Sequence, residues 1–263
     1  MYQLKWNKAI VYDEHHPNDC VLEICEPITD KEVPLLIYFH GGGLCTGSYS
    51  LCPSLEALVQ QHGIAVASVE YRKYPSAVYP DFIVDSANAI AWLYNVWKMK
   101  EKHSSIFVGG SSAGGYLSMM LCFAKQYLNA AGVSHDKISG WIFDAGQPTS
   151  HFQVLKERGM DGRSVRIDED APLWHITESF ANQQTVPILI IAADHDMVNR
   201  LEQNVVLKTA LEHFDYPSEK IEMRVMEGYK HCQYINAMDT DGRYVYAELL
   251  ADFICRWNCF SKE

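Results

Sequence analysis

Short apolar runs rich in β-branched residues alternate with longer amphipathic runs along most of this chain. The strand-like runs cover 9–13, 20–25, 34–40, 64–72, 104–110, 138–146, 186–194 and 220–228, and the helix-like runs cover 54–63, 80–98, 113–130, 199–214 and 242–257. Such alternation is typical of a parallel sheet with helices on both faces. The first two strand-like runs, separated by a short polar turn, predict an antiparallel pair. We therefore expect an α/β fold with a mostly parallel, eight-stranded sheet.

The segment 147–185 does not fit this alternation. It contains Pro148, Gly162 and Pro172 together with several charges, and only isolated helical pieces. About 40 residues without a clear element are uncommon inside a compact domain and usually form a lid or a binding loop. The 263 residues contain no recognisable linker or repeat. The chain, 1–263, is therefore predicted to form one domain in which 147–185 is a small lid-like insertion.

The charge balance and the length of the apolar runs exclude two classes of partner. Acidic residues outnumber Lys and Arg by 33 to 22, which gives a formal net charge of −11, and no basic stretch interleaved with aromatic residues offsets it. A nucleic-acid backbone would on average be repelled. None of the apolar runs approaches the roughly 18 residues that suggest a membrane span. We expect neither a nucleic acid nor a membrane as partner.

Cysteine usage and the N-terminal residues bear on the cellular compartment. The eight cysteines include no C-x-x-C pair, and several lie in apolar runs, where a reduced thiol behaves as a small buried hydrophobe. Residues 1–19 lack the apolar core and the cleavage pattern of a signal peptide. These features favour a reducing, cytoplasmic location. The pair His15 and His16 lacks ligand spacing to other candidates, so we expect no metal and no cofactor.

The stretch IFVGGSSAGGYL, residues 106–117, places two serines among four glycines between a predicted strand and a predicted helix. A plain Gly-rich turn is one interpretation of it. Residues 110–114 also match G-x-S-x-G, which holds a serine on a sharp strand-to-helix turn and directs the amide N–H groups of the helix start at the reacting centre. Only Ser112 is centred in this pattern, because the residue two positions beyond Ser111 is Ala113. Ser112 is the predicted nucleophile.

A second glycine cluster, His40-Gly41-Gly42-Gly43, directly follows a strand-like run. Consecutive glycines after a central strand can direct backbone N–H groups at an oxyanion that develops on a substrate carbonyl. Taken alone, the cluster is also consistent with an ordinary turn. Together with the serine pattern further along the chain, it favours acyl-transfer chemistry.

A serine hydroxyl needs a base that takes its proton, and the base needs a carboxylate that fixes its tautomer. In this type of fold the chain order is Ser, then Asp or Glu, then His. His231 lies in a loop after the last strand-like run and is the predicted base. Asp194 and Asp196 compete for the role of the acid. Asp196 is favoured, because it falls in the loop just beyond the strand-like run 186–194.

These motifs together resemble those of the α/β-hydrolase superfamily, and within it the hormone-sensitive-lipase-type carboxylesterases, which carry HGGG and a GxSAGG serine turn. The stretches VEYRKYPSAVYPDFIVDSANAIAWL and APLWHI are also similar to that group. The resemblance runs from about Val33 to the C-terminal helix-like run and so covers most of the chain.

The resemblance implies the α/β-hydrolase fold and the hydrolysis of carboxylic esters through an acyl-enzyme, and we expect esters with small acyl groups. The site residues that it implies are Ser112 as nucleophile, His231 as base, Asp196 as the carboxylate that orients the base, and the backbone N–H groups of Gly42, Gly43 and Ala113 as an oxyanion hole. Leu44 and Trp174 are candidates to contact the substrate, with core packing as the alternative. The expected partner is a small-molecule ester. The sequence leaves the oligomeric state open, a homodimer included.

Two other functions remain open at this point. An oligopeptidase or amidase would use the same fold and the same Ser, Asp and His, although such peptidases usually carry a propeller or a large cap domain. A non-catalytic receptor for a small ligand can also be built on this fold, as in gibberellin receptors, which usually lack one of the three residues. Each of the three has a candidate in this chain, which favours an enzyme.

Overall fold

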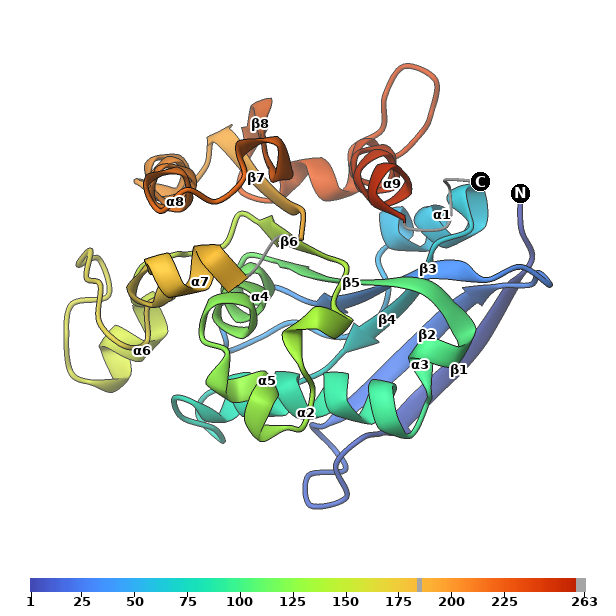
Figure 1. Cartoon of the computed structure of the whole chain (residues 1–263), viewed down its shortest axis with the longest axis horizontal. Coiled ribbons are helices and arrows are strands. Elements are labelled where there is room, and N and C mark those ends of the chain that lie inside the picture. The colour runs from blue at the N-terminus through green and yellow to red at the C-terminus, as the bar shows by residue number, and fades with distance from the viewer. Residues whose placement is uncertain (184–185, 259–263) are drawn as a thin grey trace.

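One sheet runs through the molecule and determines the arrangement of the other elements (Figure 1). The computed structural model describes residues 1–183 and 186–258, and in these residues the sheet has eight strands in the order β1-β2-β4-β3-β5-β6-β7-β8. The strands are β1 (Leu4–Val11), β2 (Val21–Pro27), β3 (Val33–Phe39), β4 (Ala65–Val69), β5 (His103–Ser111), β6 (Gly140–Asp144), β7 (Ile188–His195) and β8 (Ile221–Lys230). The pairs β1–β2 and β2–β4 are antiparallel, and the other neighbours are parallel. The expected α/β fold with a mostly parallel sheet is confirmed.

The first strand differs from its expected bounds. The sequence predicted it over 9–13, whereas β1 begins at Leu4. Ala9 has a positive φ of 53°, and the pairing with β2 shifts between Asn7 and Ile10. Such a bulge breaks the period-two pattern that indicates a strand, so the pattern marked only the second half of this one. The antiparallel pairing with β2 is as predicted.

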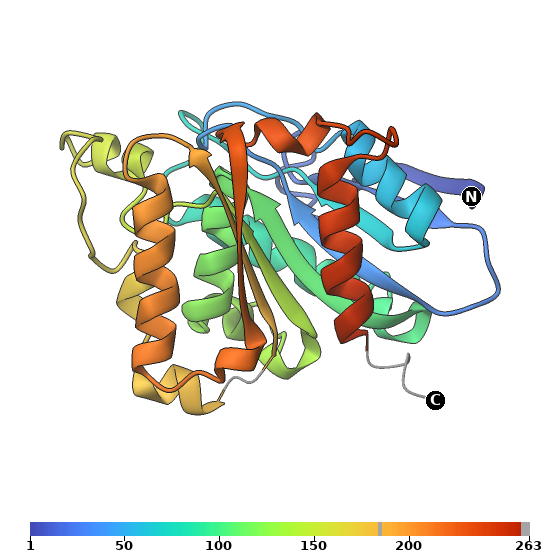
Figure 2. The ribbon, with the colours of Figure 1, turned by 90° about the horizontal axis from the view of Figure 1, so that it is seen from above.

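Helices cover both faces of the sheet, as expected (Figures 1 and 2). In the described residues they are α1 (Pro53–His62), α2 (Asp81–Asn95), α3 (Met99–Lys102), α4 (Ala113–Phe123), α5 (Gln126–Ala130), α6 (Phe152–Glu157), α7 (Glu178–Gln183), α8 (Arg200–His213) and α9 (Val245–Trp257), with the short 3₁₀ turns η1 (His135–Lys137), η2 (Pro172–His175), η3 (Ser218–Lys220) and η4 (Gln233–Asn236). None of the helices in this part of the chain combines the length and the apolar character needed to cross a bilayer.

The sheet separates two apolar cores. Successive residues of β3 face opposite sides, because side chains alternate along a strand. Leu36 packs in the core that α1 and α9 cover, and Ile37 packs in the core that α2, α4 and α8 cover. The central strands therefore read as continuous apolar runs in the sequence.

One expected helix is interrupted. The run 113–130 forms α4 and α5, because Ala124 leaves the helical conformation with φ −90° and ψ 73°. Every residue of α4 is buried. A helix that is apolar all round has no polar face, so its pattern does not mark where the helix ends.

The segment 147–185 lies at the end of the molecule opposite the N terminus and contains α6, η2 and α7 (Figures 1 and 2). Its residues 184 and 185 lie outside the described residues. The buried carboxylate of Asp170 accepts a hydrogen bond of 2.8 Å from Arg158. The backbone carbonyl oxygen of Asp170 accepts a hydrogen bond of 2.8 Å from the Tyr116 hydroxyl on α4. The first contact is internal to the segment, and the second attaches the segment to α4 in the helix layer beside the sheet.

Candidate active site

Ser112 occupies a sharp turn between β5 and α4. Its backbone has φ 53° and ψ −111°, a strained conformation for a residue with a side chain. The turn needs the glycines on either side, since a Cβ atom on Gly110 or Gly114 would overlap the carbonyl oxygen of Phe39 on the neighbouring strand β3. The motif therefore lies in the strand-turn-helix context that the sequence predicted, with Ser112 directly before the first turn of α4.

The side chain of His231 lies between a serine hydroxyl and a carboxylate. Its Nε2 is 2.8 Å from Ser112 Oγ, and its Nδ1 is 2.5 Å from Asp196 Oδ1. A carboxylate can only accept, so Nδ1–H donates to Asp196, and Nε2 of the neutral ring accepts from the Ser112 hydroxyl. Such a chain of contacts can move a proton from the hydroxyl to the imidazole and stabilise the imidazolium that results.

Asp196 and Asp194 have different surroundings. Asp196 is the first residue after β7, its side chain is 1% exposed, and its Oδ1 also accepts a 2.6 Å hydrogen bond from the Met197 N–H. Asp194 is still within β7, and its Oδ1 accepts a 2.8 Å hydrogen bond from the Gly228 N–H, which lowers the pKa of the Asp194 carboxyl. The structure thus brings Asp196, and not Asp194, to the imidazole of His231.

The glycine loop after β3 lies against the Ser112 turn. Strands β3 and β5 are neighbours with Phe39 paired to Gly110, so the loop after the one and the turn after the other meet at the same edge of the sheet. Gly42 and Gly43 have positive φ values of 118° and 62°. Among the described residues, neither of their amide N–H groups has a hydrogen-bond acceptor. These groups are available to an oxyanion, as is the N–H of Ala113 in the first turn of α4.

A pocket of about 350 Å³ opens above Ser112, and we call it the serine pocket. Besides the glycine loop and Ser112, its lining includes Phe152, Met197, His231 and Cys232. Of the residues expected to contact substrate, Leu44 is fully buried in the larger core and Trp174 is 58% exposed on η2, and neither lines this pocket. Substrate contact by Leu44 and Trp174 stays a prediction.

Glu70, at the end of β4, fixes the glycine loop through His40. The Nε2 of His40 lies 2.8 Å from Glu70 Oε1, and the ring stacks on Tyr71 at 4.6 Å. Burial alone would raise the pKa of the Glu70 carboxyl, but contacts from His40 and Lys73 outweigh burial and lower the pKa. Glu70 was not identified from the sequence, although an acidic residue near the end of the apolar run 64–72 was a usable signal.

Asp144 is a second acid that sequence reasoning missed. It ends β6, is fully buried, and accepts a hydrogen bond from the Tyr234 hydroxyl. Burial raises the pKa of this carboxyl to about 7, although hydrogen bonds from Tyr234 and Tyr246 act in the opposite direction. Its backbone oxygen accepts a 2.7 Å hydrogen bond from the Ser112 N–H, so Asp144 supports the serine turn from behind.

The described residues also bear on metals and thiols. No group of three or more His, Cys, Asp or Glu side chains in them could hold a metal ion. The cysteines in this part of the chain are free thiols. Of the four that the sequence placed in apolar runs, Cys25 and Cys122 are buried in the cores as expected, whereas Cys232 is half-buried and Cys255 is exposed.

Comparison with known proteins places the chain among proteins of the α/β-hydrolase fold. A family model described as alpha/beta hydrolase fold matches residues 36–235. The probable carboxylesterase 6 of Arabidopsis thaliana is 39% identical over 99 residues, which are 35% of this chain and 30% of that protein. The kynurenine formamidase of Drosophila melanogaster is 23% identical over 219 residues, which are 81% of this chain and 71% of that protein. The propionate-bound esterase Est2 from Thermogutta terrifontis superimposes with a TM-score of 0.73 at 19% identity, over 100% of this chain and 96% of that one.

Proposed function

Because the chain belongs to the α/β-hydrolase fold family, we propose that it is a serine hydrolase that cleaves carboxylic esters with small acyl groups through an acyl-enzyme. The observation that carries the proposal is the position of His231, which contacts both the Ser112 hydroxyl and the Asp196 carboxylate. These three side chains supply a nucleophile, a base and a group that holds the base in the required tautomer.

In the proposed reaction Ser112 Oγ attacks the ester carbonyl carbon while His231 Nε2 takes the hydroxyl proton. The N–H groups of the glycine loop and of the first turn of α4 stabilise the oxyanion, and one such donor lowers the barrier by about 3 kcal/mol. The imidazolium then gives its proton to the alcohol oxygen as the C–O bond to the alcohol breaks. The alcohol departs, and the acyl group remains bound to Ser112 Oγ. A water molecule attacks this acyl-enzyme with His231 again as base, and the acid is released.

The size of the serine pocket supports a small acyl group. Its volume of about 350 Å³ is near the lower end of ligand pockets in general. Phe152 on α6 lines it from the segment 147–185. We therefore propose that this segment serves as a lid over the serine.

The test compares the two adjacent serines. Ser112→Ala should abolish both hydrolysis of p-nitrophenyl acetate and labelling by a fluorophosphonate probe, with the circular dichroism spectrum unchanged. The matched control Ser111→Ala removes a hydroxyl one residue away and should retain labelling. A folded Ser112→Ala protein that keeps its activity would contradict the proposal. A wild-type protein that neither binds the probe nor cleaves esters would favour the receptor hypothesis instead.

A second candidate function is hydrolysis of a formamide or other amide by the same residues. The long alignment with a protein named kynurenine formamidase favours it. Formamides differ from esters in the leaving group, because His231 would have to protonate an amine nitrogen as the C–N bond breaks. Formanilide and phenyl formate share the acyl group, so the ratio of their kcat/KM values distinguishes the two functions.

A further inference from the structure

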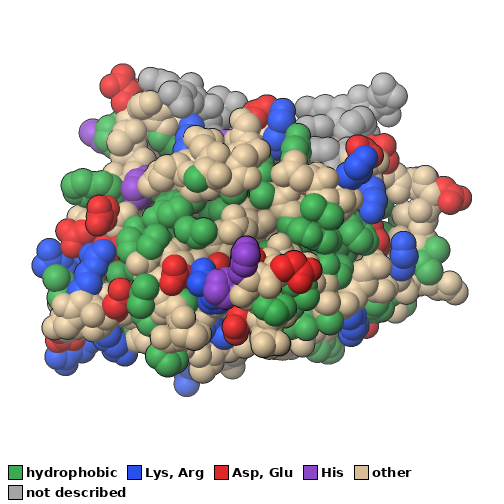
Figure 3. Space-filling view, turned by 90° about the horizontal axis from the view of Figure 1, so that it is seen from below, with side chains coloured by type: hydrophobic (Ala, Val, Ile, Leu, Met, Phe, Trp, Pro, Cys, Tyr) green, Lys and Arg blue, Asp and Glu red, His purple; other side chains and the backbone are tan. Residues whose placement is uncertain are grey.

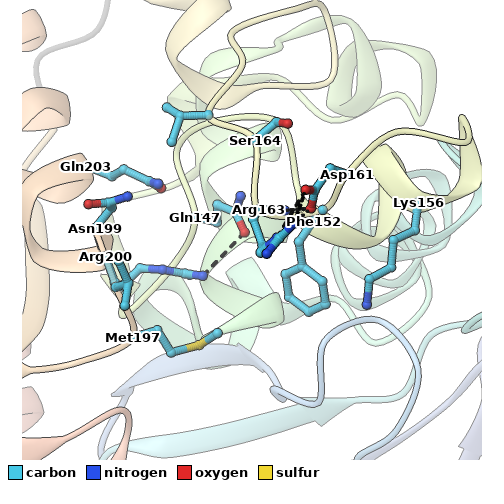
Figure 4. Close-up of a pocket in the computed structure, with 13 residues that line it drawn as sticks. Gln147, Phe152, Lys156, Asp161, Arg163, Ser164, Met197, Asn199, Arg200 and Gln203 are labelled. Atoms are coloured by element: carbon cyan, nitrogen blue, oxygen red, sulfur yellow. Dashed lines mark hydrogen bonds and ion pairs between the residues drawn. The ribbon is translucent and has the colours of Figure 1, made fainter.

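A larger pocket adjoins the serine pocket. Its volume is about 720 Å³, and it lies between the 147–165 part of the lid segment and the start of α8 (Figure 4). Phe152 and Met197 line both pockets, so a molecule that reaches Ser112 can extend past them into this space. We call it the cationic pocket because Lys156, Arg163 and Arg200 line it.

The charge in this pocket is opposite to the charge of the chain. The protein carries a formal net charge of −11, yet the cationic pocket has three cations and one acid, Asp161. Asp161 is paired with Arg163, at 2.6 Å between Oδ2 and Nη2. In residues 1–183 and 186–258, no carboxylate forms an ion pair with Lys156 or Arg200. At the end of the molecule where Figure 1 places α6, Figure 3 shows Lys and Arg side chains together with Asp and Glu side chains.

Arg200 is the most informative of these cations. It is the first residue of α8 and only 5% exposed. Its Nη1 donates to the carbonyl oxygen of Ala145 at 2.8 Å, and its Nη2 donates to Gln147 Oε1 at 3.3 Å. Figure 4 shows its guanidinium extending toward Gln147. The charge of Asp196 acts on Arg200 from nearby, but that carboxylate contacts His231 and not the guanidinium. A guanidinium has five N–H donors, and its planar edge matches a carboxylate, so the neutral acceptors of Arg200 leave that match unused.

Other features of the pocket agree with an anionic occupant. The positive end of the α8 dipole lies at the same place. Much of the remaining lining is apolar, from Phe152, Val165, Met197 and Val198. This combination fits an organic acid with a hydrocarbon chain better than it fits a strongly hydrated phosphate.

We propose that the cationic pocket binds a carboxylate of the substrate, so that the preferred substrate is an ester with a carboxylate several atoms from the bond that is cleaved. This inference rests on the proposed ester hydrolysis. The carboxylate can belong to the alcohol, with a small acyl group in the serine pocket, or to the acyl group, whose far end then extends beyond the serine pocket. The two cases share the same recognition by Arg200 and Lys156.

The first experiment compares esters of equal shape and different charge. Monoethyl adipate is compared with ethyl 6-methylheptanoate, in which an isopropyl group replaces the carboxylate, and with the cation ethyl 5-aminopentanoate. Shorter and longer half-esters, from succinate to suberate, find the best length. The butanoyl ester of 5-hydroxypentanoate and 5-methylhexyl butanoate form the matching pair for a carboxylate on the alcohol. We expect kcat/KM to favour the anion of one pair by roughly tenfold or more, mainly through KM.

Variants of the pocket residues then test whether Arg200 and Lys156 bind the substrate carboxylate. Arg200→Met should bring the anion-to-neutral ratio of kcat/KM close to one, and Lys156→Gln should lower the ratio by a smaller factor. Lys5→Gln is the control, because it removes one positive charge on β1, at the other end of the sheet. If Arg200→Met does not fold, Lys156→Glu provides a second test. Lys156 is exposed, and Glu at this position reverses its charge, so this variant should lower the anion-to-neutral ratio of kcat/KM more than Lys156→Gln does.

Failure of this inference is distinguishable from failure of the proposed function. If the neutral esters are cleaved and no anion is preferred, the carboxylate site is wrong while ester hydrolysis stands. A preference that survives Arg200→Met and Lys156→Glu equally contradicts the assignment to this pocket. Calorimetric binding of monoethyl adipate to Ser112→Ala needs no turnover. The butanoyl ester of 5-hydroxypentanoate is titrated in the same way. If that protein binds neither anion better than the matching neutral ester, the site is refuted even where no ester is cleaved.

Discussion

The imidazole of His40 lies 2.8 Å from the carboxylate of Glu70, and this contact joins the glycine loop after β3 to the end of β4. The loop carries the amide N–H groups of the proposed oxyanion hole. These groups can stabilise an oxyanion only if the loop keeps them in a fixed position. His40 is therefore a positioning residue in the proposed enzyme, and Glu70 is the group that holds it.

Replacement of Glu70 should affect turnover more than binding. In Glu70→Ala, His40 Nε2 loses its partner and keeps only the contact of Nδ1 with the Gly41 carbonyl oxygen, so the glycine loop can shift. We expect kcat to fall roughly tenfold with little change in KM, because an oxyanion hole acts in the transition state. Steady-state kinetics with p-nitrophenyl acetate measure both constants. Glu56→Ala, an exposed acid on α1, is the control. A rise in KM at constant kcat would contradict this role of Glu70.

The two acids at the end of β7 should differ sharply in kinetic effect. Asp196→Asn keeps the shape of the side chain but favours the wrong tautomer of His231, so kcat should fall by about 10⁴-fold. Asp194→Asn also removes a carboxylate charge, two residues before Asp196, and should change kcat only a few-fold. Equal losses in the two variants would mean that Asp196 does not act through His231.

Gly114 should tolerate no side chain. A Cβ atom there would overlap the Phe39 carbonyl oxygen, which is backbone of a central strand and cannot move aside. We expect Gly114→Ala to lower the free energy of unfolding by about 3 kcal/mol or more, or to prevent folding. Gly132→Ala is the control, since it has a positive φ of 79° but nothing within 4 Å, and should cost about 1 kcal/mol. Urea denaturation measures both values.

The buried acid Asp144 should make stability depend on pH. Its pKa is raised to about 7 in the folded protein, whereas an aspartate in an unfolded chain has a pKa of about 3.9. Folding therefore takes up a proton between these values, and this contribution to stability is present at low pH and lost as the pH rises through 7. Asp144→Asn does not titrate, so the free energy of unfolding of the variant minus that of the wild type should increase by on the order of 2 kcal/mol from pH 5 to pH 8.

Urea titrations of both proteins at one-unit intervals measure this difference. An Asp144→Asn difference that stays constant over the same range would show that Asp144 ionises in the folded protein as it does in the unfolded chain.

Local motifs explain why much of the fold and the candidate site could be predicted. A G-x-S-x-G turn and a run of glycines express backbone requirements within a few residues, so Ser112 and the glycine loop were recognisable in the sequence. The alternation of strand-like and helix-like runs likewise determined the class of fold. The preference for Asp196 over Asp194 needed only a count from the end of a strand.

Contacts between distant residues could not be predicted in this way. Glu70 meets His40 because β4 lies next to β3, and the chain order of strands does not give their spatial order. An arginine at the start of an amphipathic helix is usually on the surface, and Arg200 is buried only because the segment after β6 covers it. Leu44 follows the glycine loop directly but, with a positive φ of 62°, lies in the core.

The pairing of Phe39 with Gly110 has a consequence for engineering of this protein. The spacing between the glycine loop and the Ser112 hydroxyl is determined by two adjacent core strands and not by the loops themselves. If the proposed function holds, a library that diversifies 152–165 while leaving β3 and β5 unchanged should therefore alter which esters are accepted without displacing the hydroxyl from the amide groups. Selectivity and reactivity can then be varied separately in one scaffold.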